Sequence, residues 1–329
     1  MTKSRFQGQK AHTLTHRMNR SRMPVIGAEK SPKANSSHTI RVNSYVWAAC
    51  GMNFLSAVYT MIGEIHMTNF DYHKSGAVSK SVLDMIHKSP QYYKYCMDNP
   101  REQTDSMLLG SVVHKLVLEP KDFGAEYAVI PDCDKRTKDG KAVYKAFCDD
   151  LQDGVTAVPG DVYRQAQAMA EAVKAHPVAA KLLTDGEAEQ SYFWEQDGIK
   201  CSCRPDWIRN DGLVVDLKTT KDASPDGFQK SAYNFRYYVQ AWWYIHGLRL
   251  LGINATEFIF IAVESTAPYT VSVYAADDLF FKLGEIEAME DFETYKECMK
   301  SENWYGYEKE PEIHSLSVPE WVERMIELL

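Results

Sequence analysis

Several patterns that identify common classes of enzyme are missing from this chain of 329 residues. It has no P-loop, no glycine-rich dinucleotide-binding pattern, no GxSxG nucleophile motif, no helicase motif and no internal repeat. These absences argue against a P-loop NTPase, a Rossmann dehydrogenase, an α/β-hydrolase and a repeat protein. Any functional site must therefore be formed by residues outside these local sequence motifs.

Cysteine and positive charge are also limited. The seven cysteines are odd in number and irregularly spaced, which excludes a disulfide framework and is typical of a reducing cytoplasm. Cys201 and Cys203 are two residues apart on an expected strand and do not form a zinc-binding CxxC pair. The formal net charge of −8 argues against a protein that coats DNA with a broadly basic surface, so any nucleic-acid surface must be local.

The N-terminal part differs in composition from the rest. Residues 1–41 hold nine lysines and arginines but a single acid, Glu29, which predicts a disordered basic tail. Residues 42–63 are uncharged, and such a run after basic residues can be a signal peptide or membrane anchor. Polar residues interrupt this run, so we favour an appended segment and expect no stable membrane association. We therefore expect an extension over residues 1–66 and a folded domain over residues 67–329.

Within the folded part, hydrophobic periodicity predicts alternating groups of helices and strands. Helices are expected at 79–87, 104–119, 161–180 with a break at His176-Pro177, 225–250 and 277–299. Strands are expected at 189–195, 199–208, 256–264 and 269–274, with a hairpin after the second. This order favours an α/β or α+β domain in which helices flank a mixed central sheet containing an antiparallel meander.

The hairpin, residues 203–220 (CRPDWIRNDGLVVDLKTT), brings two acids together. A turn at residues 210–212 with Gly212 at positive φ would place Asp206 opposite Asp216. Lys218 would share their face because side chains alternate along a strand. Opposed carboxylates destabilise a sheet unless something offsets their repulsion, and a divalent cation does so. The alternative is a salt-bridge cluster on an exposed strand.

Other candidate residues lie before and after the hairpin. His114 lies on the expected helix 104–119 beside the small residues Gly110 and Ser111, where it is either a ligand or a packed helical histidine. Glu189 begins the strand expected next to the hairpin. On the helix that follows, three polar side chains share one face, and they either support the site or form an aromatic core stripe: Tyr237, Gln240 and Tyr244.

The ordered set of these residues resembles the PD-(D/E)xK nuclease superfamily. More specifically, it is similar to the nuclease domain of exodeoxyribonuclease VIII (RecE) from phage and prophage recombination systems. The similar stretches include LGSVVHKLVLEP, EQSYFW, CRPDWI, VVDLKTTKDASPDGFQKS and YYVQAWWY, and the resemblance runs from about Asp71 to Val322. The Asp-x-Lys motif alone is weakly specific, whereas the full set in this order is strong.

The resemblance implies an activity and its partners. The family degrades linear double-stranded DNA from its ends in the 5′-to-3′ direction and leaves 3′ overhangs. Its usual partner is a single-strand annealing protein of the RecT type, and a ring-shaped homo-oligomer fits the family. Two alternatives remain open: a single-strand-directed or helicase-linked nuclease of the same superfamily, and a catalytically weak DNA-binding or scaffold protein.

The resemblance also implies a role for each candidate residue. Mg²⁺, or Mn²⁺, would be bound by Asp206, Asp216, His114 and the carbonyl of Leu217. Lys218 would orient and help to deprotonate the attacking water, either as a general base or as a fixed electrostatic donor. Gln240, with Tyr237 or Tyr244, would position Lys218 or the scissile phosphate. Glu189 would polarise a metal-bound water or only support the sheet.

Overall fold

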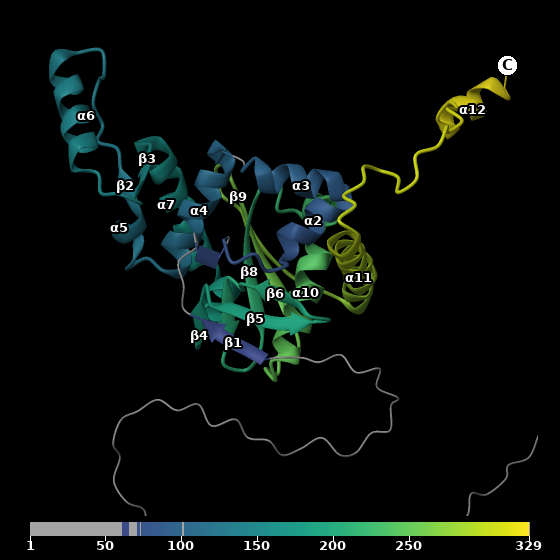
Figure 1. Cartoon of the computed structure of the whole chain (residues 1–329). Coiled ribbons are helices and arrows are strands. Elements are labelled where there is room, and N and C mark those ends of the chain that lie inside the picture. The colour runs from purple at the N-terminus through teal and green to yellow at the C-terminus, as the bar shows by residue number, and fades with distance from the viewer. Residues whose placement is uncertain (1–60, 66–70, 73, 101, 329) are drawn as a thin grey trace, which may run out of the picture. The chain divides into compact units, whose positions relative to one another are not determined.

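The structure, a computed structural model, describes residues 61–65, 71–72, 74–100 and 102–328 (Figure 1). The expected basic tail and most of the uncharged run 42–63 lie outside the described residues. Residues 61–65, which the sequence analysis assigned to the extension, form strand β1 (Met61–Ile65) and pair with a strand of the folded part. In the part of the chain that the structure describes, none of the helices has the length and apolar character needed to cross a membrane.

A five-stranded mixed sheet forms the centre of the fold, as the sequence predicts (Figure 1). Its strand order is β10-β9-β8-β7-β4, in which β8 and β9 are parallel and all other neighbours are antiparallel. The strands are β4 (Gly186–Ala188), β7 (Trp207–Arg209), β8 (Val214–Thr220), β9 (Phe258–Glu264) and β10 (Val271–Ala275).

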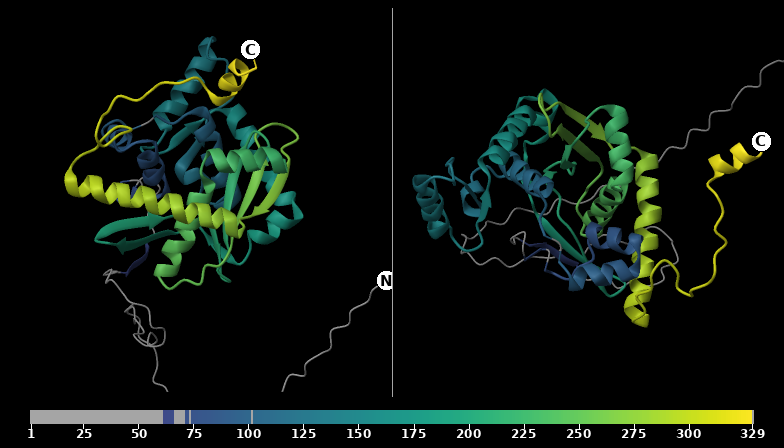
Figure 2. Two further views of the ribbon diagram at one scale, coloured as in Figure 1. Left: turned by 90° about the vertical axis from the view of Figure 1, so that its right-hand side faces the viewer. Right: turned by 90° about the horizontal axis from the view of Figure 1, so that it is seen from above.

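Alternation along β8 and β9 gives the sheet two buried faces. Val214 and Phe260 belong to one hydrophobic core, whereas Val215 and Leu217 belong to the other. Helices α10 (Tyr237–Leu250) and α11 (Asp278–Ser301) contribute to the first core, and α4 (Asp105–Leu118) and α7 (Gly160–Ala175) contribute to the second (Figure 2, right). Asp216 follows the same alternation as Val214 and therefore lies on the face covered by α10.

The remaining elements follow in chain order. The other helices are α2 (Lys80–Lys88), α3 (Pro90–Asp98), α5 (Phe123–Glu126), α6 (Lys138–Asp150), α8 (Pro177–Leu182), α9 (Pro225–Asn234) and α12 (Glu320–Ile326). Strands β2 (Tyr127–Val129) and β3 (Thr156–Val158) form a separate parallel pair. The break between α7 and α8 falls at His176-Pro177, as expected.

The strands of the expected antiparallel meander are divided between two sheets. Strands β5 (Ser191–Gln196) and β6 (Ile199–Cys203) pair with β1 in a second sheet, and β7 belongs to the central sheet. The expected strand 199–208 is thus divided at residues 204–206. Pro205 lies at this division, and proline cannot donate a backbone hydrogen bond to a ladder.

The expected helix 225–250 is also two helices. Arg236, between α9 and α10, has φ of 53° in the left-handed region, which ends the first helix and redirects the chain. The two helices therefore differ in direction although their sequence has no proline or glycine at the junction. Tyr237 begins the second helix.

The hairpin between β7 and β8 has the predicted register. Trp207 pairs with Val215 and Ile208 with Val214, and the Arg209 amide donates to the Leu213 carbonyl at 2.9 Å. Gly212 has φ of 88°. The ladder ends before Asp206, whose Oδ2 instead accepts a hydrogen bond from the Leu217 amide at 2.7 Å.

We predict that Gly212→Ala destabilises the fold more than Gly198→Ala does. Both glycines have positive φ, so each alanine costs about 1–2 kcal/mol of backbone strain. A Cβ at Gly212 would also lie 1.9 Å from the Asn254 carbonyl oxygen, whereas nothing lies within 4 Å at Gly198. This clash should add about 1–3 kcal/mol to the loss, measured as the free energy of unfolding in urea. Equal losses for the two variants would contradict the geometry of the turn.

Candidate active site

One cavity of about 790 Å³ gathers most of the predicted site residues. Its wall includes His114 from α4, side chains from the ends of the strands, and the polar face of α10. The predicted residues that line it are His114, Glu189, Asp206, Lys218, Tyr237, Gln240 and Tyr244. Asp216 and Leu217 are each 1% exposed and do not line the cavity, but Asp216 contacts Lys218 and Gln240, which do.

Three potential metal ligands converge at one end of the cavity. His114 Nδ1 lies 3.5 Å from Asp206 Oδ2 and 4.0 Å from Glu189 Oε1. One donor atom from each of the three residues lies within 4.8 Å of the other two. An imidazole and two carboxylates are a donor set that suits divalent cations, so the cluster could hold one. Glu189 was expected near this set, to polarise a metal-bound water or support the sheet, and not as a ligand.

The backbone holds Glu189 in an unusual conformation. The residue lies between β4 and β5, with φ of 52°, and not in a strand as expected. Its amide donates to the Asp206 carbonyl at 3.1 Å, and Arg204 Nε contacts both its carbonyl (2.9 Å) and its carboxylate (3.1 Å). These contacts direct the carboxylate toward His114 and Asp206. Burial, together with repulsion from Asp206, raises the pKa of Glu189 to about 7.

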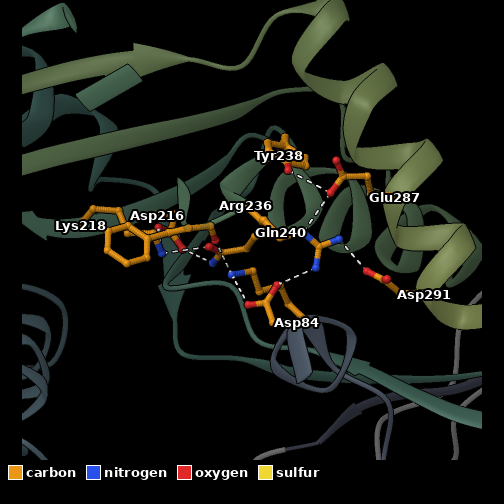
Figure 3. Close-up of polar contacts among 10 residues, drawn as sticks. Asp84, Asp216, Lys218, Arg236, Tyr238, Gln240, Glu287 and Asp291 are labelled. Atoms are coloured by element: carbon orange, nitrogen blue, oxygen red, sulfur yellow. Dashed lines mark hydrogen bonds and ion pairs between the residues drawn. The ribbon is translucent and has the colours of Figure 1, made fainter. Parts of the chain in front are cut away.

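Asp216, Lys218 and Gln240 form the second part of the site (Figure 3). Gln240 Nε2 donates to Asp216 Oδ1 at 2.5 Å, and Lys218 Nζ lies 2.6 Å from Asp216 Oδ2. Lys218 Nζ also donates to Gln240 Oε1 at 2.9 Å, so each of the three side chains contacts the other two. Burial, with repulsion from Asp206, raises the pKa of Asp216 to about 6, although Lys218 opposes this.

The charge of Lys218 depends on opposing effects. Burial lowers the pKa of Lys218, but attraction to Asp216 and Asp206 outweighs burial, so the pKa is raised overall. Lys218 Nζ also lies 4.7 Å from the centre of the Tyr237 ring, within range of a cation–π interaction. The lysine is therefore a fixed ammonium group in the metal-free protein.

The two tyrosines of the predicted α10 face differ in their contacts. Tyr237 lies against Lys218 and stacks on Phe260. Tyr244 lines the cavity and packs its ring edge-on against Phe258, and burial raises its pKa well above the usual value. Of these two tyrosines, Tyr237 is the one whose ring contacts Lys218.

Sequence reasoning missed three cations that line the cavity: Lys80, Lys115 and Arg204. Lys80, at the start of α2, lies 2.6 Å from Asp84 Oδ2 and donates to the Phe235 carbonyl at 2.8 Å. The apolar periodicity that predicts the helix at 79–87 gives no signal for Lys80. Arg204, which contacts Glu189, directly precedes Pro205-Asp206 in the CRPDWI stretch. Its place beside an acid of the motif was the signal that could have indicated it.

Comparison with known proteins agrees with this geometry. The chain matches a family described as a PDDEXK-like domain of unknown function (DUF3799) over residues 79–313. The chain belongs to this family. The match confirms the predicted PD-(D/E)xK superfamily, and with it a nuclease fold, but it does not distinguish the RecE type. No curated protein matches the chain.

Solved structures support the fold. A protein from Eubacterium rectale, provisionally described as an exonuclease, is similar with a TM-score of 0.51 and 13% sequence identity. The match covers 70% of this chain and 86% of that protein. A second structure, SSO0001, matches over 57% of this chain and 87% of its own at 13% identity. Its TM-score of 0.23 is too low to support a comparison of folds.

We predict that Asp206→Asn weakens binding of Mn²⁺ or Mg²⁺ by at least about tenfold, because it removes one anionic ligand. Asparagine can still accept the Leu217 hydrogen bond, so the backbone should hold its place. Isothermal titration calorimetry measures the effect. Asp211→Asn, in the exposed turn of the same hairpin, is the matched control and should bind the cation normally. Equal affinity in all three proteins would exclude a metal site at Asp206.

We predict that Glu189→Gln changes how stability depends on pH in the metal-free protein. Because folding raises the pKa of Glu189 from its ordinary value to about 7, the folded state retains a proton that the unfolded state loses. The free energy of unfolding of the wild type therefore falls as pH rises from about 4.5 to 7. Glutamine removes this loss, so the variant should gain on the order of 1–3 kcal/mol relative to wild type by pH 8.

Urea unfolding at pH 4 and pH 8 in the presence of a chelator measures this difference. Glu187→Gln is the matched control, because Glu187 is exposed on the neighbouring strand β4. Its difference from wild type should not change with pH. A constant difference for Glu189→Gln as well would mean that Glu189 is ionised in the folded protein across this range.

Proposed function

We propose that the protein is a metal-dependent exodeoxyribonuclease that degrades linear double-stranded DNA from its ends. The observation that carries this proposal is the cavity itself, where the His114–Glu189–Asp206 cluster lies beside the Asp216–Lys218–Gln240 group. Hydrolysis of a phosphodiester needs a positioned water and positive charge on the phosphate oxygens. The His114–Glu189–Asp206 cluster would hold a cation that supplies this charge, and the Asp216–Lys218–Gln240 group would position the water.

The donor set fits a divalent cation, which we propose to be Mg²⁺, with Mn²⁺ as a substitute. His114, Asp206 and Glu189 would hold it, and Asp216 and the Leu217 carbonyl would be further ligands. The N–H and C=O of one residue point to the same side of an extended strand, so the Leu217 carbonyl shares the side of its amide, which donates to Asp206. When bound, the cation would polarise the scissile phosphate and lower the pKa of a bound water.

Lys218 is proposed to act as a fixed electrostatic donor. In the metal-free protein its raised pKa keeps it an ammonium at neutral pH, and an ammonium donates hydrogen bonds but accepts no proton. Asp216 and Gln240 hold its Nζ, so it needs no reorientation to orient a water or contact a phosphate oxygen. This favours an orienting role for Lys218 over that of a general base.

End-directed digestion rests on the resemblance to RecE-type domains. We propose 5′-to-3′ polarity, 3′ single-stranded overhangs and a role in phage-type DNA recombination in the cytoplasm. The partner would be a RecT-type annealing protein, and a ring of several copies around the duplex would explain processive digestion. The exonuclease description of the similar Eubacterium rectale protein supports the choice of an exonuclease.

We predict that the wild-type protein with Mg²⁺ releases nucleotides from free-ended linear duplex DNA, and that Asp216→Ala and Lys218→Ala each reduce the rate at least about 100-fold. Asp216→Ala removes a carboxylate that holds Lys218 Nζ, and Lys218→Ala removes that amino group itself. Release of acid-soluble label from a long duplex measures the rate. Lys221→Ala is the matched control, because Lys221 is exposed just beyond the end of β8, and it should retain wild-type activity.

The same assay tests direction and end dependence. Duplexes closed at both ends by hairpins should resist digestion, and nuclease-resistant linkages at the 5′ ends should protect more than those at the 3′ ends. Cleavage of closed duplexes would show that the protein is an endonuclease and not an exonuclease. Full activity in Asp216→Ala and Lys218→Ala would show that this cavity is not the active site.

A further inference from the structure

Arg236 occupies a position that costs free energy. It is the residue before α10, and its φ of 53° lies in the left-handed region, which is strained for a residue with a Cβ. Glycine would adopt this conformation without that strain. Strained backbone persists only where the surroundings hold it, so the contacts of the Arg236 side chain need an explanation.

The Arg236 guanidinium contacts carboxylates from two other helices (Figure 3). It lies 3.2 Å from Asp84 of α2, and 2.9 Å from Glu287 and 2.6 Å from Asp291 of α11. Its side chain is 10% exposed. Asp291 is 7% exposed, so the Arg236–Asp291 pair is buried on both sides, and removal of the arginine would leave this carboxylate buried without a compensating charge. Arg236 therefore joins α2 and α11 to the start of α10.

The partners of Arg236 make further contacts that strengthen this junction. Glu287 also accepts a hydrogen bond from the Tyr238 hydroxyl at 2.9 Å, which fixes the first turn of α10 against α11. Asp84 also pairs with Lys80, and Lys80 donates to the Phe235 carbonyl at 2.8 Å. The residues on both sides of Arg236 are thus held by the same set of charges.

The turn that is held in this way carries part of the active site. Tyr237 and Gln240 lie in the first turn of α10, directly after Arg236. Gln240 contacts both Lys218 and Asp216, and the Tyr237 ring lies 4.7 Å from Lys218 Nζ. A small rotation of this turn would move the Gln240 amide away from two partners at once. The position of Lys218 thus depends on the orientation of the turn.

We propose that Arg236 is a positioning residue that sets the orientation of the first turn of α10 and, through Gln240, the position of Lys218. This inference rests on the proposed function for its kinetic consequence, but its structural consequence can be measured without any nuclease activity. Arg236 does not line the cavity, so it acts through Gln240 and makes no contact with DNA there.

Two substitutions separate the backbone from the side chain. Arg236→Gly keeps the left-handed turn without strain but removes the guanidinium. Arg236→Lys keeps a positive charge but not the fork that reaches three carboxylates. We expect Arg236→Gly to lower kcat on linear duplex DNA about 10- to 100-fold while KM changes less than about threefold, because the reacting groups lose their alignment but DNA contacts stay. Arg236→Lys should recover part of the lost kcat.

Hydrogen exchange followed by mass spectrometry gives a reading that is independent of catalysis. Arg236→Gly should speed exchange in peptides that cover residues 237–244, and should leave peptides of β9 unchanged. Wild-type kcat in Arg236→Gly, or exchange at the wild-type rate in residues 237–244, would overturn the proposal. If the wild type digests no DNA but exchange speeds up as expected, the positioning role stands and the proposed function fails.

Glu287→Gln is a milder variant that tests the positioning role of Arg236 if Arg236→Gly does not fold. It leaves Arg236 in place with its other two partners and should lower kcat about 3- to 10-fold at unchanged KM. Glu290→Gln, on an exposed position of the same helix, is the matched control and should behave as wild type. Equal kcat in Glu287→Gln and Glu290→Gln would overturn the proposal by this route.

Discussion

The site depends on the pairing of a buried carboxylate with a lysine and an amide. Asp216 is 1% exposed and lies on the sheet face that α10 covers, where an isolated ionised carboxylate would cost several kcal/mol. Lys218 and Gln240 contact its two oxygens and offset that cost. The same contacts fix the lysine and the amide, so the interactions that make the burial possible also arrange the groups that face the cavity.

The fold supplies these partners by simple alternation. Asp216 and Lys218 are two residues apart on β8 and share the face that α10 covers, whereas Leu217 between them packs in the opposite core. Gln240 reaches both because it lies in the first turn of α10. The left-handed residue at the α9–α10 junction sets where that turn begins. One backbone position outside the cavity therefore influences how the lysine and the carboxylate meet.

The hairpin could be predicted from sequence because its determinants are local. The Asn-Asp-Gly turn and the alternation of β8 fix the register within about ten residues, and the structure has the predicted pairs. The contacts that the sequence did not reveal are distant along the chain. Lys80 lies 155 residues from the Phe235 carbonyl that it contacts, and Arg236 lies 152 residues from Asp84. No periodic pattern encodes such pairs, since each depends on where two helices pack.

Local reasoning also failed where the backbone leaves regular structure. The expected strand 199–208 has a nearly continuous strand-like pattern, and Pro205 was the sign that the ladder could not continue through it. Glu189 takes a left-handed conformation that its sequence neighbours do not predict, because hydrogen bonds to Arg204 and Asp206 hold it there. Both departures from regular structure occur at the site, where they turn one carboxylate toward another.

The convergence of these acids links metal binding to folding. Burial raises the pKa values of Glu189 and Asp216 in the metal-free protein, and repulsion from Asp206 adds to the effect. The fold is thus less stable at neutral pH than it would be without this repulsion. A divalent cation bound at His114, Glu189 and Asp206 would stabilise the folded state by mass action and oppose the same repulsion. The arrangement that the hairpin and α4 impose is therefore best suited to the state in which a cation is bound.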